Sequence, residues 1–424
     1  MSSAGSPPRP VTSHQLRRVS ADALLAVLRM GEVMTASELM EATGFSRTSV
    51  HEVCADLLRL GRIVEVDGST TPGALSDATG TPGAAQGMSG GRGRPPRRYA
   101  FAAGSGAVVA VDLGVHTITV WVTDLRGVLR GAAERTLLDP VTADRTTVLD
   151  ELVGSALAGA GMRTGDVLVA VVGVPSSVSA VQQIEYPAEQ RGVALATAWA
   201  TGHGWPVLIE NDANLAALGE RWSGVARSLD NVVVVLAGER LGAGILMGGR
   251  LVRGEHGSAG ELRFVSLMPA IGPEVLGIAR HARELAAAAI ADGTATFGAP
   301  AQRPAVDGAA ALDTPDVSAR TVFRAAADGD ESALRIVRTV CERLAQLVGV
   351  LATLLDPAMV VISGGIADAG RVLVDTIQQL LPAAMIDNPP LVAASSLGAD
   401  AVVTGGVRLG LDHLERHLLD GLVG

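Results

Sequence analysis

The sequence predicts an α/β protein in which a small winged helix-turn-helix precedes a body of two similar α/β lobes. Three observations support this fold class. Residues 14–60 hold three short amphipathic helical segments, and two strand-like segments follow them. Residues 108–129 and 232–252 repeat one pattern, in which apolar strands are joined by glycine turns. A chain of 424 residues also exceeds what one compact core usually holds, so more than one domain is expected.

The first two helices are predicted from their boundaries. We expect the first over residues 21–30, with Ser20 as its N-cap and Gly31 as its stop. Thr35 and Glu38 are three residues apart before a second apolar segment, which is the spacing of a capping box. These signals place two short helices at the start of the chain.

The third helix is expected to open at Ser46, after the turn that follows Gly44. Its apolar residues recur at helical spacing and leave polar residues of the first turns on another face. Such positions reach base edges when a recognition helix enters the major groove. The candidate DNA-contacting residues are Arg47, Thr48, Ser49 and His51. A three-helix bundle with a solvated polar face is the alternative.

Residues 62–66 and 97–102 are expected to form the two strands of a β-wing. Residues 68–91, between them, are rich in small residues and cannot bury enough apolar surface to offset their ordering entropy, so we expect a disordered insert. The following GRGRPPRR is a basic, extended segment that suits a narrow minor groove, unless it is only a solvated linker. Its candidate DNA contacts are Arg92, Arg94, Arg97 and Arg98.

Composition limits the partners. The net charge is −10, yet residues 1–100 carry 11 arginines against nine acids, so only this part is expected to meet an anion. The chain has no lysine, which excludes a Walker-A loop. It has no apolar run of the roughly 18–20 residues that span a bilayer, and no secretion signal. With Cys54 and Cys341 far apart, we expect a reduced cytoplasmic protein without membrane contact or a cysteine-built metal site.

The repeated strand pattern predicts two lobes that face each other across a cleft, with ligands where glycine turns and strand ends converge. Several motifs then follow in order: VVGVPSSV, IENDANLAALGE, GSAGELRF, LATLLDPAMVVISGGIA and SLGADAVVTGGVRLG. Through them the body, about residues 108–411, resembles the ROK family of repressors, open reading frames and sugar kinases. The head is similar to that of the family's repressor branch.

The resemblance implies an actin-like, ATPase-type body and a division of the chain. The expected parts are a disordered tail over 1–13, a winged helix-turn-helix domain over 14–102 and an effector domain over 105–424. Within the effector domain, lobe 1 is expected to cover about 105–220 together with a C-terminal helix, 397–424. Lobe 2 is expected to cover about 221–396.

The resemblance also implies a ligand cleft. In the family's sugar kinases an Asp of the END-x-N motif accepts the proton of the attacking hydroxyl, and Asp212 matches it. Glu261 matches the acid of an AGE loop that binds sugar hydroxyls. Carboxylates and amides suit a polyol, whose hydroxyls both donate and accept. The candidate effector-binding residues are Asn211, Asp212, Asn214 and Glu261. The alternative is that the first three only cap the helix that follows.

The phosphate-binding turns depart from the kinase pattern. The turn that reads DxGGT in the kinases reads DLGVHT from Asp112, and Val115 resists the positive φ that glycine allows. The second turn, GTGxG, places Glu239 where anions should dock. SGGI, residues 363–366, survives as an adenosine-side turn but supplies no phosphate contact. We therefore expect Asp212 to be non-catalytic and the body to use no cofactor.

The region after the AGE loop departs as well. Arg263 and Phe264 stand where the family has Gly and a zinc-binding His, and no cysteine follows in VSLMPAIGPEVLG, so no metal site is expected. PSSV and YPAEQ also differ from the family's sugar-binding segments. His203 stands shortly before the END-x-N motif and His256 shortly before Glu261 in the sequence. A lone histidine is, however, more often structural than a ligand.

The sequence as a whole predicts a DNA-binding transcriptional regulator, a repressor, with no enzymatic activity. Its expected partners are double-stranded DNA with an inverted-repeat operator, a small effector such as a sugar, and further copies in a homodimer or homotetramer. Three alternatives stay open. They are a regulator whose cleft binds no sugar, an active sugar kinase with a DNA-binding head, and a scaffold that binds no DNA.

Overall fold

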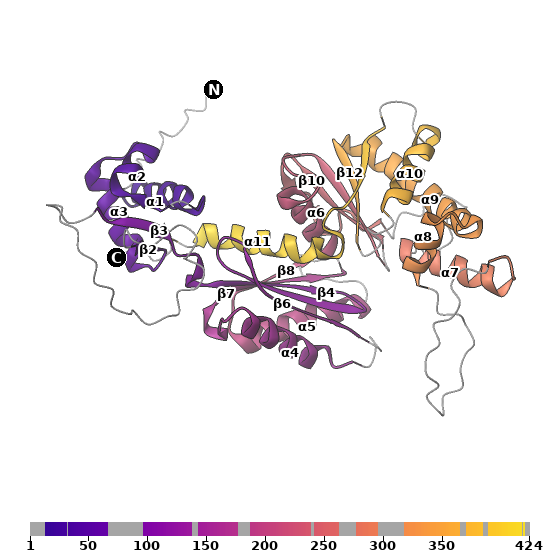
Figure 1. The fold of residues 1–424 in the computed structure, drawn as a ribbon, viewed down its shortest axis with the longest axis horizontal. Helices are drawn as coiled ribbons and strands as arrows, with labels where there is room; N and C mark the ends of the chain where they lie inside the picture. Colours follow the sequence, from indigo (N-terminus) through magenta and orange to yellow (C-terminus); the bar gives the residue numbers. More distant parts are fainter. Residues whose placement is uncertain are drawn as a thin grey trace, which may run out of the picture.

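The computed structural model describes residues 13–31, 33–66, 96–137, 143–176, 187–238, 241–262, 277–295, 318–364, 370–384, 389–417 and 419. Residues 1–12 of the predicted tail (1–13) and the predicted wing insert (68–91) lie outside the described residues, while Ser13 belongs to a helix. Figure 1 shows three parts in a row: an N-terminal head, a lobe on one sheet and a lobe on a second sheet.

The head packs three helices against a three-stranded sheet. The helices are α1 (Ser13–Arg29), α2 (Ala36–Thr43) and α3 (Arg47–Arg59). The strands are β1 (Met34–Thr35), β2 (Ile63–Val66) and β3 (Arg98–Phe101), which pair antiparallel in the order β1-β3-β2. Leu24, Leu39 and Leu57 are fully buried where the three helices meet. Three helices and a small antiparallel sheet are compatible with the expected winged helix-turn-helix.

Helix boundaries in the head follow the predicted signals in one case and not in another. Thr35 and Glu38 form the capping box of α2, and Gly44 ends that helix in the left-handed conformation. The prediction for α1 was wrong, because it begins at Ser13 and Ser20 lies inside it. The Ser20 hydroxyl donates to the carbonyl of Leu16, one turn earlier, so a serine read as a cap is satisfied within the helix.

The two sheets of the body share one topology. Lobe 1 has the order β6 (Leu129–Thr136), β5 (Thr117–Thr123), β4 (Ala107–Leu113), β7 (Val167–Val174) and β8 (Val207–Asn211). Lobe 2 has the order β11 (Arg250–Leu251), β10 (Leu241–Met247), β9 (Val232–Ala237), β12 (Met359–Ser363) and β13 (Leu391–Ala394). In each sheet the first three strands are antiparallel and the last two join in parallel. The predicted duplication is this shared arrangement.

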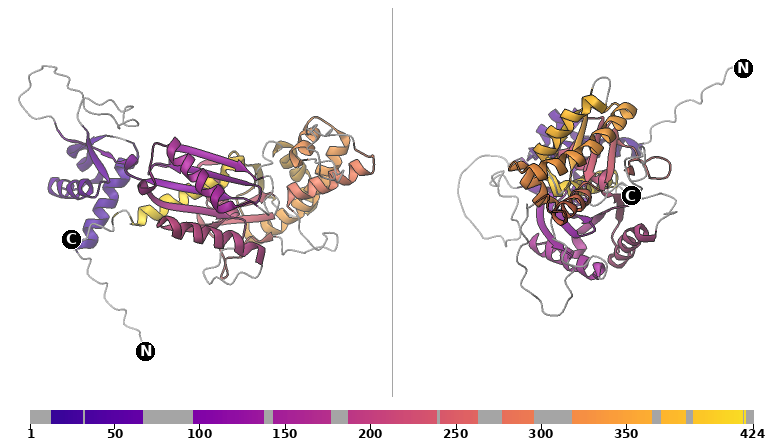
Figure 2. Two further views of the ribbon diagram at one scale, coloured as in Figure 1. Left: turned by 90° about the horizontal axis from the view of Figure 1, so that it is seen from below. Right: turned by 90° about the vertical axis from the view of Figure 1, so that its right-hand side faces the viewer.

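Helices cover both sheets (Figure 2). Lobe 1 carries α4 (Arg145–Gly159) and α5 (Pro187–His203) on one face. A helical layer of α7 (Ile278–Ala291), α8 (Ala319–Ala327), α9 (Glu331–Leu355) and α10 (Gly370–Ala384) packs on lobe 2. Between the sheets lie α6 (Asp212–Ser223) and α11 (Ala401–His417), whose apolar residues share a core with both. These two helices therefore join the lobes.

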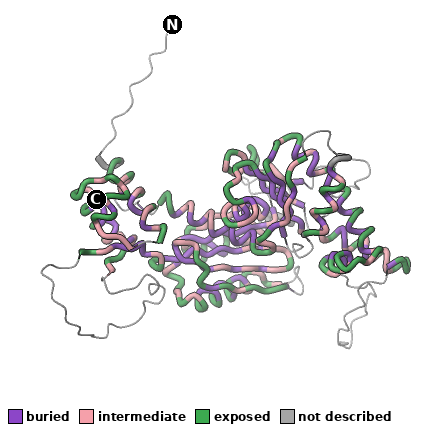
Figure 3. The backbone as a smooth tube through the Cα atoms, turned by 45° about the horizontal axis from the view of Figure 1, so that its top comes forward, coloured by how far each residue is buried: buried purple, intermediate pink, exposed green. Residues whose placement is uncertain are grey.

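The helices α6 and α11 meet backbone to backbone. A Cβ atom added at Gly405 would lie 1.7 Å from the carbonyl oxygen of Leu215, and one added at Gly219 would lie 2.4 Å from that of Ala401. Figure 3 shows the buried character of this layer. Only glycine permits so close an approach, so the relative position of the two helices is fixed by main-chain contact.

The far end of α11 contacts the head. Arg29 of α1 forms an ion pair with Glu415 at 3.0 Å, and Arg18 donates to the carbonyl of Arg416. From lobe 1, Arg126 donates to the carbonyl of Leu28 at 3.3 Å. Apolar residues of the head and of α11 also belong to one buried cluster. The head is thus packed on the body as well as connected to it.

The cysteines and the helix lengths complete the picture. Cys54 and Cys341 are buried free thiols, and burial raises the pKa of each to about 12, so neither ionises near neutral pH. Within the described residues no helix is both long and apolar enough to cross a bilayer.

Candidate DNA-binding surface and ligand cleft

The N-terminal turns of α3 form an exposed polar surface. Ser46 caps the helix, because its side chain accepts a hydrogen bond from the backbone N–H of Ser49 at 3.2 Å. Arg47, Thr48 and His51 are exposed, and their side chains make no hydrogen bond or ion pair to the part of the chain that the structure describes. Ser49 is half-buried and also contacts the cap hydroxyl, at 2.9 Å. Three of the four predicted residues are therefore free to meet a ligand.

The two described arginines of the predicted arm have partners within the head. Arg97 forms an ion pair with Glu65 across the wing at 2.8 Å, and both side chains are exposed. Such surface pairs contribute little, so this guanidinium is available to a phosphate. Arg98 donates to the carbonyl of Val33 at 3.1 Å and so fastens the third strand to the segment before α2. Arg92 and Arg94 lie outside the described residues.

Strand β10 anchors both halves of the predicted ligand cleft. A Cβ atom at Gly244 would lie 2.1 Å from the carbonyl oxygen of Ala213, so the start of α6 sits directly on the strand. Gly260 has a φ of +85° and accepts a hydrogen bond from the N–H of Ala243 at 2.9 Å. Asp212 is the residue directly before Ala213, and Glu261 is the residue directly after Gly260. The structure thus brings the two acids to one short stretch of β10.

The amides of the motif cap α6 and also leave an acceptor unused. Asn211 accepts from the N–H of Asn214 at 3.1 Å and donates to the carbonyl of Ser176 at 3.1 Å. Asn211 is therefore the N-cap of α6. Asn214 and Ser176 are each 3% exposed, and the oxygens Oδ1 of Asn214 and Oγ of Ser176 have no partner among the described residues. Buried unsatisfied oxygens are costly, so this corner of the cleft favours a ligand that donates hydrogen bonds.

One ion pair that the sequence did not reveal holds the cleft together. Glu210 is 5% exposed and binds Arg253, with the closest nitrogen-to-oxygen distance 2.6 Å. Its other oxygen accepts from the N–H of Asn211 and from Nδ2 of Asn214. The carbonyl of Arg253 accepts from Ala259, in the loop that ends at Glu261. The END-x-N motif contains Glu210, but nothing local marks its partner 43 residues later.

Asp112 is a second acid that was not assigned to the site. It lies at the end of β4 and is half-buried. The pKa of its carboxyl is raised to about 8, chiefly by burial and next by the carboxylate of Asp212, while the guanidinium of Arg145 partly opposes both effects. At neutral pH one proton is therefore held at this pair of acids.

The turn after Asp112 is organised by an arginine. Arg145, at the start of α4, donates to the carbonyls of Leu113, Gly114 and Val115. Phosphate-binding turns present N–H groups to their ligand, whereas here the carbonyls converge on a cation. We expected Val115 to resist a positive φ, and the turn avoids the conflict, since Val115 has no positive φ. The residues Glu239 and Arg240 of the second turn lie outside the described residues.

The two histidines do not join the cleft residues. His203 pairs with Asp150 at 2.9 Å and stacks on Trp205 with a centroid distance of 4.4 Å. His256 is exposed in the loop before Glu261. Within the described residues no group of three or more His, Cys, Asp or Glu could hold a metal ion. The replaced zinc segment, from Arg263 on, lies outside that part.

The raised pKa of Asp112 predicts a pH-dependent effect of Asp112→Asn. A carboxyl whose pKa is raised on folding stabilises the protein below its unfolded pKa, and this contribution is lost as the pH rises toward 8. The variant does not titrate, so it should gain stability relative to the parent from pH 5 to pH 8, by up to about 1.4 kcal/mol per pH unit. Thermal unfolding at both pH values measures the difference.

Asp144→Asn is the control with the opposite sign. The hydroxyl and then the N–H of Thr147 donate to Asp144 and lower the pKa of its carboxyl. A lowered pKa gives stability that is present above the unfolded value and lost toward acid, so this variant should lose stability relative to the parent as the pH rises from 3 to 5. A difference for Asp112→Asn that stays constant from pH 5 to pH 8 would rule out the proposed protonation.

Comparison with known proteins places this geometry in a family. The model of the ROK family matches residues 108–412. The glucokinase of Halalkalibacterium halodurans is 33% identical over 211 residues, which are 47% of this chain and 62% of that enzyme. The xylose repressor of Bacillus subtilis is 24% identical over 254 residues, 59% of this chain and 61% of that protein. The chain thus spans less than two thirds of either relative.

A solved structure extends the similarity to the head. The crystal structure of a ROK family transcriptional regulator, a homolog of the E. coli MLC protein, superposes with a TM-score of 0.68 at 20% identity. The match covers 96% of this chain and 99% of that one. At this identity the likeness shows the fold, which is an actin-like, two-lobed body behind an N-terminal helical head.

Proposed function

This chain belongs to the ROK family, and from that premise we propose that it is a DNA-binding transcriptional regulator. The observation that carries the proposal is the exposed start of α3, where Arg47, Thr48 and His51 have no partner in the described chain. A winged helix-turn-helix places such residues in the major groove. The similarity of the whole chain to a solved regulator supports the same reading. We take the protein to be a cytoplasmic repressor.

The mode of DNA binding follows from the head. A homodimer or homotetramer with two-fold symmetry would present two recognition helices to an inverted repeat, with half-sites one or two helical turns apart. All basic side chains are arginines, which suits bidentate contacts to guanine and to phosphates. Because phosphate contacts release counterions, the affinity should fall steeply with salt.

The cleft is proposed to bind the effector. Asp212, Glu261 and the unsatisfied oxygens of Asn214 and Ser176 form a polar site suited to a polyol such as a sugar. We propose no phosphate transfer, because the carbonyls of the first turn converge on Arg145, whereas phosphate-binding turns present N–H groups. Binding would favour one arrangement of the lobes and shift DNA affinity by the difference in its affinity for the two states.

Two further candidates have specific support. The pair Asp112 and Asp212 and the glucokinase relative favour an active sugar kinase, which ATP turnover with sugars would reveal. The changed PSSV segment favours a regulator whose cleft binds no sugar. A thermal-shift screen with sugars, amino sugars and sugar phosphates separates this last case from the inducible regulator.

The test of DNA binding is a selection from genomic DNA. Purified protein is mixed with sheared DNA of its own source at about 0.15 M salt, where nonspecific binding is already weakened, and the retained fragments are sequenced. We expect a few enriched sites that share an inverted repeat. Uniform retention would mean that the head contacts only phosphates, and no retention in the presence or absence of the screened sugars would contradict the proposal.

A further inference from the structure

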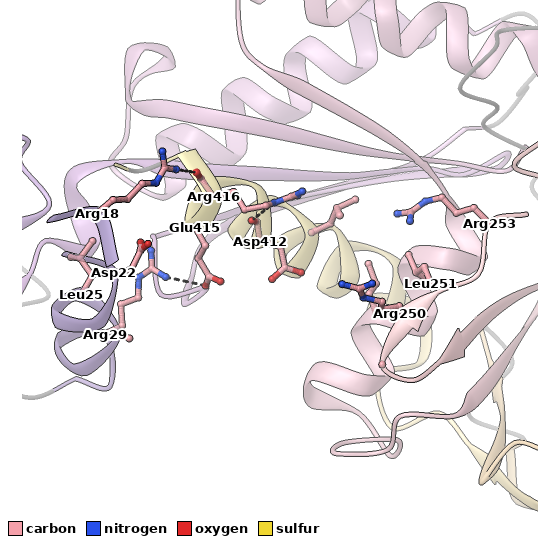
Figure 4. Close-up of a pocket in the computed structure, with 14 residues that line it drawn as sticks. Arg18, Asp22, Leu25, Arg29, Arg250, Leu251, Arg253, Asp412, Glu415 and Arg416 are labelled. Carbon is pink, nitrogen blue, oxygen red and sulfur yellow. Dashed lines mark hydrogen bonds and ion pairs between the residues drawn. The ribbon is translucent and has the colours of Figure 1, made fainter. Parts of the chain in front are cut away.

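A groove of about 1140 Å³ lies between the head and the body, and its lining does not include Asp212 or Glu261 (Figure 4). One wall is α1 of the head, the floor is α11, and the other wall is the end of β11. Its charged lining is dominated by five arginines: Arg18, Arg29, Arg250, Arg253 and Arg416. Leu218, Leu251 and Leu409 supply an apolar part near Arg250.

Two of the three acids of the groove form ion pairs with arginines. Glu415 pairs with Arg29 at 3.0 Å and with Arg408 at 3.2 Å, and Asp412 also pairs with Arg408. Burial raises the pKa of Asp22, and the charges of Arg18 and Arg29 partly oppose this shift. The lining thus has five guanidiniums against three acids, and none of these acids stands at the end formed by lobe 2.

At the end of the groove formed by lobe 2, one arginine has no partner among the described residues, and another also contacts the ligand cleft. The side chain of Arg250 is exposed and makes no hydrogen bond or ion pair to the described residues. Arg253 lines the groove but is held by the buried Glu210, whose other oxygen positions Asn211 and Asn214 in the cleft. The side chain of Arg253 therefore belongs to both the groove and the ligand cleft.

We propose that this groove is a second ligand site, which binds a small molecule carrying a phosphate or diphosphate group on Arg250 and Arg253. Arginine recognises such groups with paired N–H donors. An anion in the groove competes with Glu210 for Arg253. It therefore weakens the Arg253–Glu210 ion pair, and with it the positioning of Asn211 and Asn214 in the cleft. By linkage the two ligands weaken each other's binding to the same degree.

The binding test uses inorganic pyrophosphate and isothermal titration at constant ionic strength. We expect saturable binding that Arg250→Ala weakens at least 10-fold. Arg338→Ala is the matched control, because it removes an exposed arginine of α9 whose partner is Glu342. Glu210→Gln should tighten binding, since it releases Arg253. No binding at up to about 10 mM pyrophosphate, which corresponds to very weak affinity, or equal effects of the Arg250 and Arg338 variants, would overturn the proposal.

The inference rests on the proposed function in one respect only, namely that binding in the groove would regulate DNA binding. The titration uses the full chain without DNA, so it reports on the groove whether or not an operator exists. Selection of genomic sites tests the head independently. If pyrophosphate binds but no genomic site is selected, the proposed groove site stands and the proposed regulatory function fails. If sites are selected but pyrophosphate does not bind, the regulatory function stands and the groove site fails.

Discussion

Arg47→Ala is expected to weaken sequence-specific DNA binding strongly while the head stays folded. An arginine that contacts a guanine with two hydrogen bonds contributes about 1–3 kcal/mol of discrimination, so the operator affinity should fall about 10- to 100-fold. The Arg47 side chain is exposed and has no partner in the described chain, so its removal should leave the circular dichroism and the melting temperature unchanged. Fluorescence anisotropy with the selected operator and with a shuffled duplex measures the specific part.

Arg59→Ala is the matched control for this experiment. Arg59 lies at the other end of α3, is exposed, and has only a 3.4 Å ion pair with Asp56. The two variants remove the same charge from the same helix. If Arg59→Ala lowers the operator affinity as much as Arg47→Ala does, the helix contributes only electrostatic attraction, and our assignment of the recognition face is wrong.

Gly405→Ala is expected to be strongly destabilising. The added methyl group would overlap the carbonyl oxygen of Leu215, and neither helix backbone can yield without moving the other. Overpacking typically costs about 1–3 kcal/mol, and a loss of about 3 kcal/mol lowers the melting temperature by about 3 °C in a protein of this size. Differential scanning fluorimetry is sufficient to detect such a change.

Gly154→Ala supplies the comparison, since it is also a glycine within a helix. A Cβ atom at Gly154 of α4 meets nothing within 4 Å. Alanine has the higher helix propensity, by about 0.8–1.0 kcal/mol, so this variant should be neutral or slightly more stable than the parent. Equal destabilisation by both substitutions would mean that contact between α6 and α11 is not what Gly405 provides.

The fold was predictable where the signals are local. Thr35, Glu38 and Gly44 define α2 through their own backbone contacts, and the repeated strand pattern defines two sheets through strand propensity and glycine turns. The start of α1 was missed because Leu16 and Val19, in its first turns, are exposed and give no buried stripe. A helix whose end is stabilised by packing elsewhere leaves no boundary signal in its own sequence.

The candidate site was predictable only in part, for a similar reason. Asp212 and Glu261 stand in recognisable motifs, and the structure brings them to one strand. Arg253, Arg145 and the unpartnered Arg250 act through residues distant in the chain, so only the folded protein reveals them. The identity of Arg97 and Arg98 predicted a basic arm, but not that Arg98 is used to hold the wing.

The helix α11 would transmit a small rotation within the body to the position of the head. It has 17 residues, is fixed to α6 by backbone contact at Gly405, and touches the head at Glu415 and Arg416. From Gly405 to Arg416, at about 1.5 Å per residue, it is an arm of about 16 Å, so a tilt of about 7° about Gly405 moves its far end by about 2 Å. Two heads moved in opposite directions would change their separation by about 4 Å, more than the 3.4 Å rise of one base pair. A rotation too small to alter the lobes visibly would thus put a pair of recognition helices out of register by a full base step.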